Sequence, residues 1–363
     1  MTVLHVVNSL DPGGMENGVC NIAAGLLPRG VETHVACLER RGAFAERIPS
    51  SSNVHVLGKS GGFSLRAVWN LARLIRRVRP ALLHTHNLGP LIYASLATLG
   101  GRTCSIVHGE HARLAPWELE PRRIRQRHRL YRACRAIHTV SGGQRDELVR
   151  HGFAPATICA IPNGVDTGRF IPGNRNKSRD EFEIPIDAVV IGLVGRFGPY
   201  KRHDALLSAL GEIARHFPRA HLLFVGGGGS EESRIRELAA NNERVQFAGF
   251  RKDPETCFRA MDLLAIPSSN EGMSNAALEG MACGIPALGN IGCGHDEVIT
   301  SGKDGVVADL ATPADIAREI SSILANPQRL VDMGREARIT VEARFSMHAM
   351  LDAYEQLYRA HTR

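Results

Sequence analysis

Short apolar runs rich in β-branched residues alternate with longer segments of helical period along the whole chain. In the first half, the short runs predict strands, and the longer segments repeat apolar residues at the spacing of a helix with one buried face. The predicted strands are Val3–Val7, His34–Leu38, Val54–Leu57, Ala81–His84, Cys104–Val107 and Ala136–Val140, and the predicted helices include Glu16–Leu27, Leu65–Arg77 and Leu91–Leu99. This alternation indicates a parallel sheet with helices on both faces.

The same alternation starts again in the second half. Strands are predicted at Val189–Val194, Leu222–Val225, Val245–Ala248, Leu263–Ile266 and Pro286–Leu288, with helices at Asp204–His216 and Glu231–Asn241. Between the halves, the segment Ile171–Ile186 reads IPGNRNKSRDEFEIPI, in which Pro, Gly, Asn and charged residues interrupt every period. We expect the interdomain linker there. The last segments, Ala314–Ala325, Arg329–Ala343 and Met347–Arg359, are predicted to be helices with no further strand among them.

The chain is therefore predicted to hold two α/β domains of similar size, residues 1–172 and 173–345. Its 363 residues agree with this number, because domains average roughly 150 residues. Ligands of open parallel sheets bind beyond the carboxyl ends of the strands. Two such domains facing each other predict one cleft between them, and the chemical motifs should directly follow strands.

The composition of the chain indicates the cellular compartment in which we expect the protein. A hydrophobic content of 44% and a charged content of 22% are typical of globular proteins and argue against disordered or fibrous ones. From the opening MTVLHVVNSL and the absence of a long apolar run, we expect neither a leader peptide nor a membrane-spanning helix. Its eight cysteines form no C-x-x-C pair and no Cys/His group at zinc spacing. We therefore expect a cytoplasmic protein with reduced cysteines.

Charge is divided unequally between the halves. The net charge is +7, but residues 1–175 hold 23 Lys and Arg against 11 Asp and Glu, whereas residues 176–363 hold 21 against 26. The first half is thus +12 and the second −5.

The most informative motif is EGMSNAALE, from Glu271 to Glu279, directly after the predicted strand Leu263–Ile266. Ser274 is a good N-cap for a helix that begins at Asn275. A helix N-terminus at the mouth of a sheet suits a phosphate, because it offers free N–H groups and the positive end of the helix dipole. The Glu279 carboxylate can accept hydrogen bonds from vicinal hydroxyls such as those of a ribose. The alternative is a surface helix with two ordinary glutamates.

A second motif, GRFGPYK, also follows a predicted strand and contains Arg196 and Lys201. Two cations on one strand-to-helix turn can both reach a diphosphate, Arg through a bidentate fork and Lys as a point charge. The sequence contains no D-x-D motif. The charge of a leaving diphosphate would then be neutralised by Arg196, Lys201 and the helix start at Ser274. The alternative is an exposed basic turn.

Two glycine-containing stretches are less specific. Gly13 and Gly14 lie between the first predicted strand and helix, where they either let the backbone approach a ligand or form a tight turn. The tract Gly226–Ser230 does not complete the dinucleotide fingerprint, because Glu231 stands where its last glycine would be.

Three histidines stand near the ends of predicted strands. His108, in IVHGEH, is the one best placed to face a cleft, and His84 and His86, in LLHTHN, are weaker candidates.

An arginine-rich segment extends from Arg122 to Arg135. Helical spacing puts Arg122, Arg125, Arg129 and Arg132 on one stripe. The stripe is either a solvated face or a contact with anionic lipid headgroups or an anionic acceptor, with Trp117 at the interface. No nucleic-acid-binding motif accompanies it, so we expect no nucleic-acid partner.

Together the motifs resemble the retaining glycosyltransferases of family 4, whose GT-B fold consists of two facing Rossmann-like domains. The matching segments cover nearly the whole chain: GGME at Gly13–Glu16, HTHN, Val107–Gly109, Thr139–Ser141, Ile161–Asp166 with Phe170, Val194–Arg196 with Lys201, Phe247–Gly249, and EGMSNAALEGMACGIP. The opening NSLDPGGMENGVCN also resembles sugar transferases that accompany bacterial exopolysaccharide and exosortase gene clusters.

The resemblance implies transfer of a sugar, with retention of configuration, from a UDP- or GDP-linked donor to a glycan or lipid-linked acceptor, without a metal or other cofactor. It implies a catalytic set of His108, Arg196, Lys201 and Glu271, and a donor-binding set of Gly13, Gly14, Met273, Ser274, Asn275 and Glu279. In it, Arg196 and Lys201 hold the diphosphate, Glu271 meets the sugar hydroxyls, and His108 lies near the C6 oxygen of the sugar. It also implies that a final helix, residues 346–363, packs back on the first domain.

Three positions depart from the common family pattern. Arg202 stands where glycine is frequent, and Met273 and Ser274 replace a frequent aromatic–proline pair, which leaves the donor sugar open. Two alternatives remain. One is a non-catalytic nucleotide-sugar-binding protein on the same fold, and the other is a two-domain oxidoreductase, which the incomplete dinucleotide fingerprint disfavours.

Overall fold

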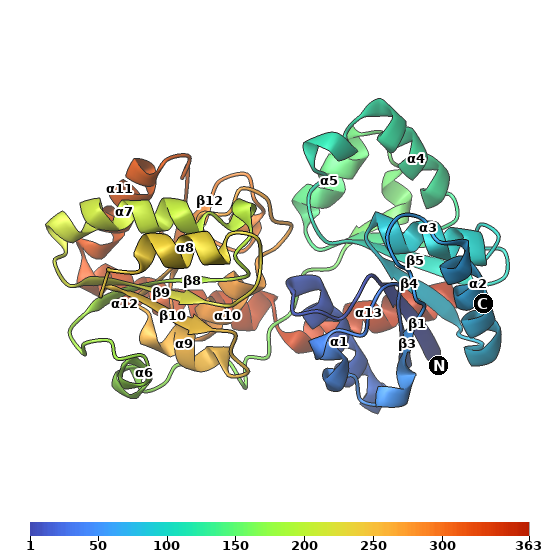
Figure 1. Cartoon of the computed structure of the whole chain (residues 1–363), viewed down its shortest axis with the longest axis horizontal. Helices are drawn as coiled ribbons and strands as arrows, with labels where there is room; N and C mark the ends of the chain where they lie inside the picture. The colour runs from blue at the N-terminus through green and yellow to red at the C-terminus, as the bar shows by residue number, and fades with distance from the viewer. Residues whose placement is uncertain (363) are drawn as a thin grey trace. The chain divides into compact units, whose positions relative to one another are not determined.

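The computed structural model describes residues 1–362, and the chain forms two compact units. The first unit comprises Met1–Asn163 and the residues from His348 onward, and the second comprises Gly164–Met347 (Figure 1). The boundary between the two units falls after Asn163, whereas the sequence predicted it after residue 172.

The first unit is built on a seven-stranded parallel sheet with strand order β3-β2-β1-β4-β5-β6-β7. Its strands are β1 Thr2–Val7, β2 Glu32–Cys37, β3 Val54–Val56, β4 Leu82–His86, β5 Ser105–Glu110, β6 Ala136–Thr139 and β7 Ile158–Ala160. Its helices are α1 Gly14–Leu26, α2 Leu65–Val78, α3 Leu88–Ala97, α4 Pro121–Tyr131, α5 Gly142–Arg150 and α13 Met347–His361. The strand order reverses between β1 and β4, so the ligand-binding edge of such a sheet lies beyond the carboxyl ends of these strands.

The second unit has a six-stranded parallel sheet of order β10-β9-β8-β11-β12-β13. Its strands are β8 Val189–Val194, β9 Ala220–Val225, β10 Val245–Gly249, β11 Leu263–Ile266, β12 Ala287–Asn290 and β13 Gly305–Ala308. Its helices are α6 Arg175–Glu181, α7 His203–His216, α8 Glu232–Ala239, α9 Pro254–Ala260, α10 Asn275–Ala282, α11 Pro313–Leu324 and α12 Pro327–Arg344. Here the order reverses between β8 and β11.

Each sheet has its own hydrophobic core. Leu4, Leu83 and Ile106 are fully buried in the first unit, and Ile191 and Phe224 in the second. Strands of a parallel sheet are covered on both faces, which is why they appear in the sequence as continuous apolar runs.

The segment Ile171–Ile186, where the sequence predicted an irregular linker, contains the seven-residue helix α6. Asn174 caps the helix by accepting a hydrogen bond from the backbone N–H of Lys177 at 3.1 Å. The Arg179 side chain is buried, pairs with Asp262 at 2.6 Å, and donates to the carbonyl oxygens of residues 186, 188 and 260. A charged residue thus points inward, so the hydrophobic period that identifies other helices is missing here.

Helix α13 belongs to the first unit. Tyr354 and Tyr358 are buried on its inner side, and Arg29 pairs with Asp352 and Glu355 at 2.5 and 3.2 Å on its outer side.

Replacing Arg179 with alanine is expected to destabilise the second unit by about 3–5 kcal/mol, because the Asp262 carboxylate loses its buried partner and the carbonyl oxygens of residues 186, 188 and 260 lose their donor. The matched control is Arg175→Ala. Arg175 pairs with the same carboxylate at 2.5 Å but is 55% exposed, so its loss is expected to cost less than about 1 kcal/mol. Urea unfolding followed by circular dichroism measures both, and equal losses would contradict the structural role given to Arg179.

Candidate functional site

In the second unit, the loops that follow β8 and β11 meet at the carboxyl edge of the sheet. The backbone N–H of Ser269 donates to the carbonyl of Tyr200 at 2.9 Å, and Lys201 Nζ donates to Glu271 Oε1 at 2.6 Å. The lysine stem lies against Gly195, where an added Cβ would be 3.1 Å from Lys201 Cε. The structure therefore brings together Lys201 and Glu271, which the sequence presented in two separate motifs.

The Lys201–Glu271 pair is largely withdrawn from solvent, with side-chain exposures of 16% and 9%. Burial alone raises the pKa of Glu271, but the Lys201 ammonium and His295 outweigh it, so the pKa is lowered. The carboxylate is therefore ionised at neutral pH. An ionised pair at a strand end, beside a helix N-terminus, is suited to hold a polar and anionic ligand.

His295 is a residue of this site that sequence reasoning missed. It is fully buried, and neither ring nitrogen has a hydrogen-bond partner among the described residues. Burial lowers its pKa, and the nearby Glu271 offsets that only in part. Gly289 makes room for it, since a Cβ there would lie 2.6 Å from His295 Cβ. The available signal was its place just after a strand, in GCGH, but no motif marked it.

Helix α10 begins where the motif predicted. The Ser274 side chain accepts a hydrogen bond from the backbone N–H of Ala277 at 3.4 Å, which confirms it as the N-cap. Asn275 is the first helical residue, Met273 is buried just before the cap, and Glu279 is half-buried one turn further on. The N–H groups of the helix start thus lie just beyond Glu271 in the chain.

Arg196 provides a second cation on the loop that carries Lys201. Its side chain is exposed and forms no ion pair with the part of the chain that the structure describes. The glycine tract packs against the same loop: the Phe197 N–H donates to Gly228 O at 2.8 Å, and a Cβ at Gly226 would lie 2.2 Å from Gly195 O. These glycines therefore shape the loop that carries Arg196.

The structure shows how an arginine is accommodated at position 202, where glycine is frequent in the family. Its φ is 59°, in the left-handed region that favours glycine. The side chain compensates by donating to the carbonyl oxygens of Pro267, Leu310 and Ala311, which ties the loops after β11 and β13 together. A cavity of about 670 Å³ opens beside it. The cavity is lined by Arg202, Ser208, Ser269, Asn290 and Asp309 among others, and by none of the predicted site residues.

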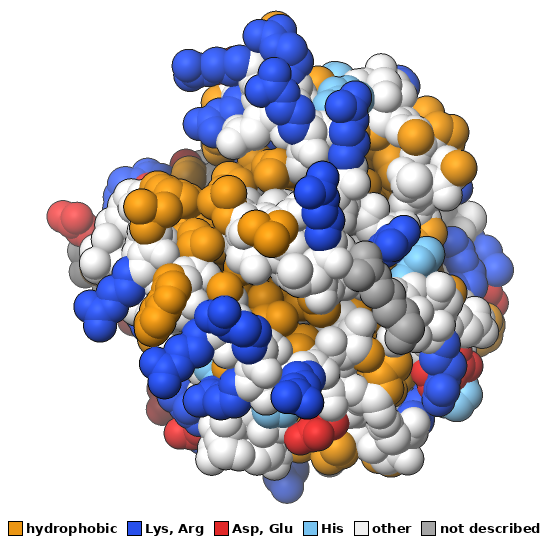
Figure 2. Space-filling model, turned by 90° about the vertical axis from the view of Figure 1, so that its right-hand side faces the viewer, with side chains coloured by type: hydrophobic (Ala, Val, Ile, Leu, Met, Phe, Trp, Pro, Cys, Tyr) orange, Lys and Arg blue, Asp and Glu red, His pale blue; other side chains and the backbone are white. Residues whose placement is uncertain are grey.

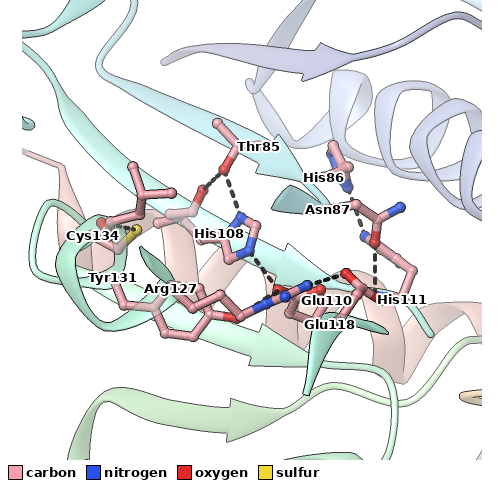
Figure 3. Close-up of polar contacts among 12 residues, drawn as sticks. Thr85, His86, Asn87, His108, Glu110, His111, Glu118, Arg127, Tyr131 and Cys134 are labelled. Atoms are coloured by element: carbon pink, nitrogen blue, oxygen red, sulfur yellow. Dashed lines mark hydrogen bonds and ion pairs between the residues drawn. The ribbon is translucent and has the colours of Figure 1, made fainter. Parts of the chain in front are cut away.

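In the first unit, His108 is fully buried on β5, away from solvent. Its Nδ1 is bonded to Thr85 Oγ1 at 2.8 Å and its Nε2 to Glu110 Oε1 at 3.3 Å (Figure 3). Glu110 also accepts from Arg127 Nε at 3.2 Å and Tyr131 OH at 2.5 Å. The sequence placed His108 at a ligand-facing strand end, but β5 continues to Glu110, so both of its ring nitrogens are engaged inside the protein. Contact of His108 with a sugar stays a prediction that this geometry does not favour.

His111 is the first residue beyond β5 and is half-buried. Its Nε2 is bonded to His86 Nδ1 at 2.8 Å, and its backbone N–H donates to Asn87 Oδ1 at 3.2 Å (Figure 3). Asn87 has a φ of 64°, a strained conformation of the kind that gathers at functional sites. Sequence reasoning missed His111 because its strand was predicted to end at Val107.

Gly13 and Gly14 lie at the start of α1, directly after the central strand β1. Gly13 is the N-cap residue in extended conformation, and Gly14 is the exposed first residue of the helix. A Cβ at Gly13 would lie 2.3 Å from Glu16 Oε2, so glycine allows that side chain to fold back on the helix start.

The arginine segment is not uniform. Arg122, Arg125, Arg129 and Arg132 are exposed, as a stripe requires. Arg127 is buried and pairs with Glu110 and Glu118 at 3.2 and 2.6 Å, so it belongs to the interior.

One group of side chains in the first unit has the composition of a metal site. The ring nitrogens of His5, His84 and His86 lie within 4.8 Å of one another, and all three rings are buried. Sequence reasoning singled out His84 and His86 but not their grouping with His5, because the three residues come from two strands. Each of these rings is also hydrogen bonded to another ring or to Tyr358.

The topology and the edge loops define a GT-B glycosyltransferase. Residues 12–169 match the family model "Glycosyltransferase Family 4", and residues 174–340 match "Glycosyl transferases group 1". The chain belongs to the family-4-like glycosyltransferases of GT-B fold.

Among curated relatives, the D-inositol 3-phosphate glycosyltransferase of Segniliparus rotundus is 34% identical over 214 residues, covering 57% of this chain and 47% of that one. The enzyme of the same name from Gordonia bronchialis is 26% identical over 390 residues, covering 96% and 84%. The chain thus spans about half the length of the first of these relatives.

Solved structures share the fold. The Anabaena Alr3699/HepE protein in complex with UDP-glucose matches with a TM-score of 0.87 at 21% identity, covering 99% of this chain and 100% of that one. Sucrose-phosphate synthase from Thermosynechococcus elongatus matches with a TM-score of 0.82 at 20% identity, covering 99% and 98%.

Replacing Lys201 with methionine is expected to lower stability by about 3 kcal/mol near pH 7, because it leaves the buried Glu271 carboxylate unpaired. In the natural protein the lowered pKa of Glu271 contributes stability above its unfolded pKa, which is lost as the pH falls through the folded pKa. In the variant, burial dominates and raises the pKa of Glu271, so the destabilisation is expected to shrink toward about pH 4.5 as the carboxyl becomes protonated. Thermal unfolding from about pH 4.5 to pH 8 measures this, and a loss independent of pH would contradict the pairing.

Proposed function

We propose that the protein transfers a glycosyl group from a nucleotide sugar to an acceptor hydroxyl with retention of configuration. The observation that carries the proposal is the arrangement at the carboxyl edge of the second sheet. There the loop after β8 carries Arg196 and Lys201, and the Lys201–Glu271 pair precedes the capped start of α10. Cations and free N–H groups at one edge are what a diphosphate leaving group requires.

In the proposed step, the bond between the sugar C1 and the diphosphate oxygen breaks, and a bond from C1 to the acceptor oxygen forms on the same face. The acceptor proton passes to the departing phosphate oxygen. Arg196, Lys201 and the N–H groups of Ser274 and Asn275 stabilise the charge that develops there. Glu271 orients the sugar hydroxyls, and Glu279 accepts hydrogen bonds from the ribose. No divalent ion takes part in the proposed step.

The donor is proposed to be a UDP- or GDP-linked sugar and the acceptor a glycan or a lipid-linked carrier. A neighbour of the same fold is described with UDP-glucose, which supports a nucleotide-sugar donor. The name of the relatives describes transfer involving an inositol phosphate. An anionic acceptor of that kind suits the +12 charge of the first half of the chain.

In the first unit, we propose that His111 rather than His108 contacts the ligand. His111 stands at the carboxyl edge of β5 and keeps Nδ1 free of any hydrogen-bond partner among the described residues. His108 uses both ring nitrogens inside the protein.

A non-catalytic nucleotide-sugar-binding protein on the same fold is the second candidate. Release of a nucleoside diphosphate from UDP- and GDP-sugars, measured with and without an acceptor extract, separates the two. Acceptor-stimulated release supports transfer, whereas binding without any release supports the second candidate.

Arg196→Met is expected to lower kcat/KM by about 100-fold, as for loss of one group that stabilises developing charge. Its thermal stability is expected to stay unchanged, because the side chain is exposed and forms no ion pair among the described residues. The matched control is Arg219→Met, an exposed arginine of the same unit that pairs with Asp187. An Arg196→Met enzyme with full turnover would contradict the proposal.

We also propose peripheral contact with an anionic membrane, through the first unit. The segment from residue 47 to 109 holds eight Lys and Arg and not one acidic residue. On α2, the exposed residues Leu65, Trp69, Arg73 and Arg76 fall within an arc of about 80° at 100° per residue. Leu96 and Leu99 are exposed on and after α3, which packs against α2. Figure 2 shows apolar side chains gathered among Lys and Arg on the face where α2, α3 and α4 lie.

Such a face suits anionic lipid better than water, because apolar side chains enter the headgroup region while arginines pair with phosphates. The exposed arginines of α4 extend the same positive charge. No helix among the described residues has the length and apolar content needed to cross a bilayer.

The double variant Leu65→Ser, Trp69→Ser is expected to weaken binding to phosphatidylglycerol vesicles by more than about tenfold, since each inserted large side chain contributes roughly 1.5 kcal/mol or more. Co-sedimentation measures this. Leu238→Ser, an equally exposed position on α8 of the second unit, is the control and should bind as the natural protein does. Equal binding of both variants, or equal binding to phosphatidylcholine, would contradict the assignment of this face.

A further inference from the structure

A continuous hydrogen-bonded chain of aromatic side chains runs through the buried face of the first sheet. It starts at His111 and passes through His86, His5, Tyr358 and His84 to His138. Its five links measure 2.8, 2.9, 3.4, 2.8 and 2.8 Å in that order. All members except His111 are fully or almost fully buried. Of these residues, only His111 has a part in the proposed function, as a contact with the ligand.

The strand register explains why these rings meet. His5 is paired with His84 across β1 and β4, and Gly109 lies between His86 and His138 in the row across β4, β5 and β6. A Cβ at Gly109 would lie 2.5 Å from His138 Nε2 and 2.9 Å from His111 Nε2. The glycine therefore leaves the space that the imidazoles fill, and α13 closes it with Tyr358.

The chemistry of the chain couples its members. Burial lowers the pKa of His5 to about 3 and of His111 to about 4, and it lowers the pKa of His84, His86 and His138 as well. Each ring is therefore neutral near pH 7, with one N–H and one lone pair. When every link holds one hydrogen and the Tyr358 hydroxyl donates to one of its two ring neighbours while accepting from the other, all donors point the same way along the chain. The tautomer of His111 is then set by the whole chain rather than by His111 alone.

We propose that this chain is a positioning device that holds His111 in one tautomer and one orientation at the carboxyl edge of the first sheet. His86 and His5 are its nearest positioning residues, and Tyr358 joins them to His84. Figure 3 shows the end of the chain at His111, where His86 is hydrogen bonded to the His111 ring and the Asn87 side chain accepts from the His111 backbone N–H. The ligand contact of His111 rests on the proposed function. The hydrogen-bonded chain that positions His111 does not depend on it.

A divalent cation fits the same rings less well. Zinc–nitrogen bonds of about 2.05 Å place tetrahedral ligand nitrogens about 3.3 Å apart, whereas His5 Nδ1 and His86 Nε2 are hydrogen bonded at 2.9 Å. The group contains no carboxylate or thiolate among the described residues that would offset the charge of a buried ion. Each ring nitrogen of His5, His84 and His86 already has a hydrogen-bond partner in another ring or in Tyr358.

The direct test is nitrogen-15 NMR of the full-length protein labelled at histidine, with the His111 signals assigned from a His111→Gln variant. The chain predicts ring shifts of a single neutral tautomer for His111 in the natural protein, and shifts averaged over both tautomers in His86→Leu. Averaged shifts in the natural protein, or one mole of bound metal per mole of purified protein, would overturn the proposal. This measurement needs no substrate, so it stands apart from any failure of the proposed transfer.

Activity provides the second readout. His86→Leu is expected to lower kcat/KM by about 10-fold to 100-fold, the usual cost of losing a group that orients a functional histidine. His86→Gln, whose amide can still bond to His111, is expected to recover part of that loss. The matched control is His34→Leu, because His34 is hydrogen bonded to His55 at 3.1 Å in the same unit but outside the chain. A loss of the same size in the control, or none in His86→Leu, would overturn the positioning role.

Tyr358→Phe is the variant to use where His86→Leu does not fold. It keeps the buried ring and removes only the hydroxyl that joins His5 to His84. His111 is then expected to shift toward tautomer averaging in the same NMR measurement. An unchanged single tautomer would show that the far half of the chain has no part in positioning.

Discussion

The ion pair between Lys201 and Glu271 is the interaction on which the proposed chemistry depends. Withdrawing two charges from water is expensive, and a buried pair adds little net stability over apolar packing. The pair lies at the carboxyl edge of a parallel sheet, just before the capped start of α10, which is where this kind of fold binds ligands. We infer that the desolvated pair is retained for ligand binding: it keeps an ammonium and a carboxylate fixed where a diphosphate and a sugar would meet.

The first unit relies on a different constraint, which is the packing of polar rings and charges inside a sheet. His108, Glu110 and Arg127 form one buried network, and the histidine chain around Gly109 forms another. In both, hydrogen bonds offset most of the cost of burying polar groups, because an unpaired polar group in such surroundings costs free energy. Helix α13 contributes Tyr358 to the second network, so the end of the chain completes the interior formed by its beginning.

The sequence was sufficient for most strands, because strands covered on both faces appear as continuous apolar runs. It was not sufficient for β7 and β13, which are short and contain small residues, nor for α6, whose Arg179 points inward. Lys201 and Glu271 could be expected to meet because both follow strands of one sheet. His295 and His111 carry no motif, and their importance depends on burial and strand ends that only coordinates show. His108 lies inside β5 rather than at its end, because the strand ends three residues later than its apolar run indicates, and its contact with a ligand stays a prediction.

Binding of UDP and GDP to the natural protein, measured by isothermal titration calorimetry with EDTA and again with excess Mg²⁺, tests the central claim most directly. If Arg196, Lys201 and the start of α10 neutralise the diphosphate, at least one of the two nucleotides binds in EDTA, and its affinity does not depend on the metal. Binding that appears only when Mg²⁺ is supplied would contradict the account.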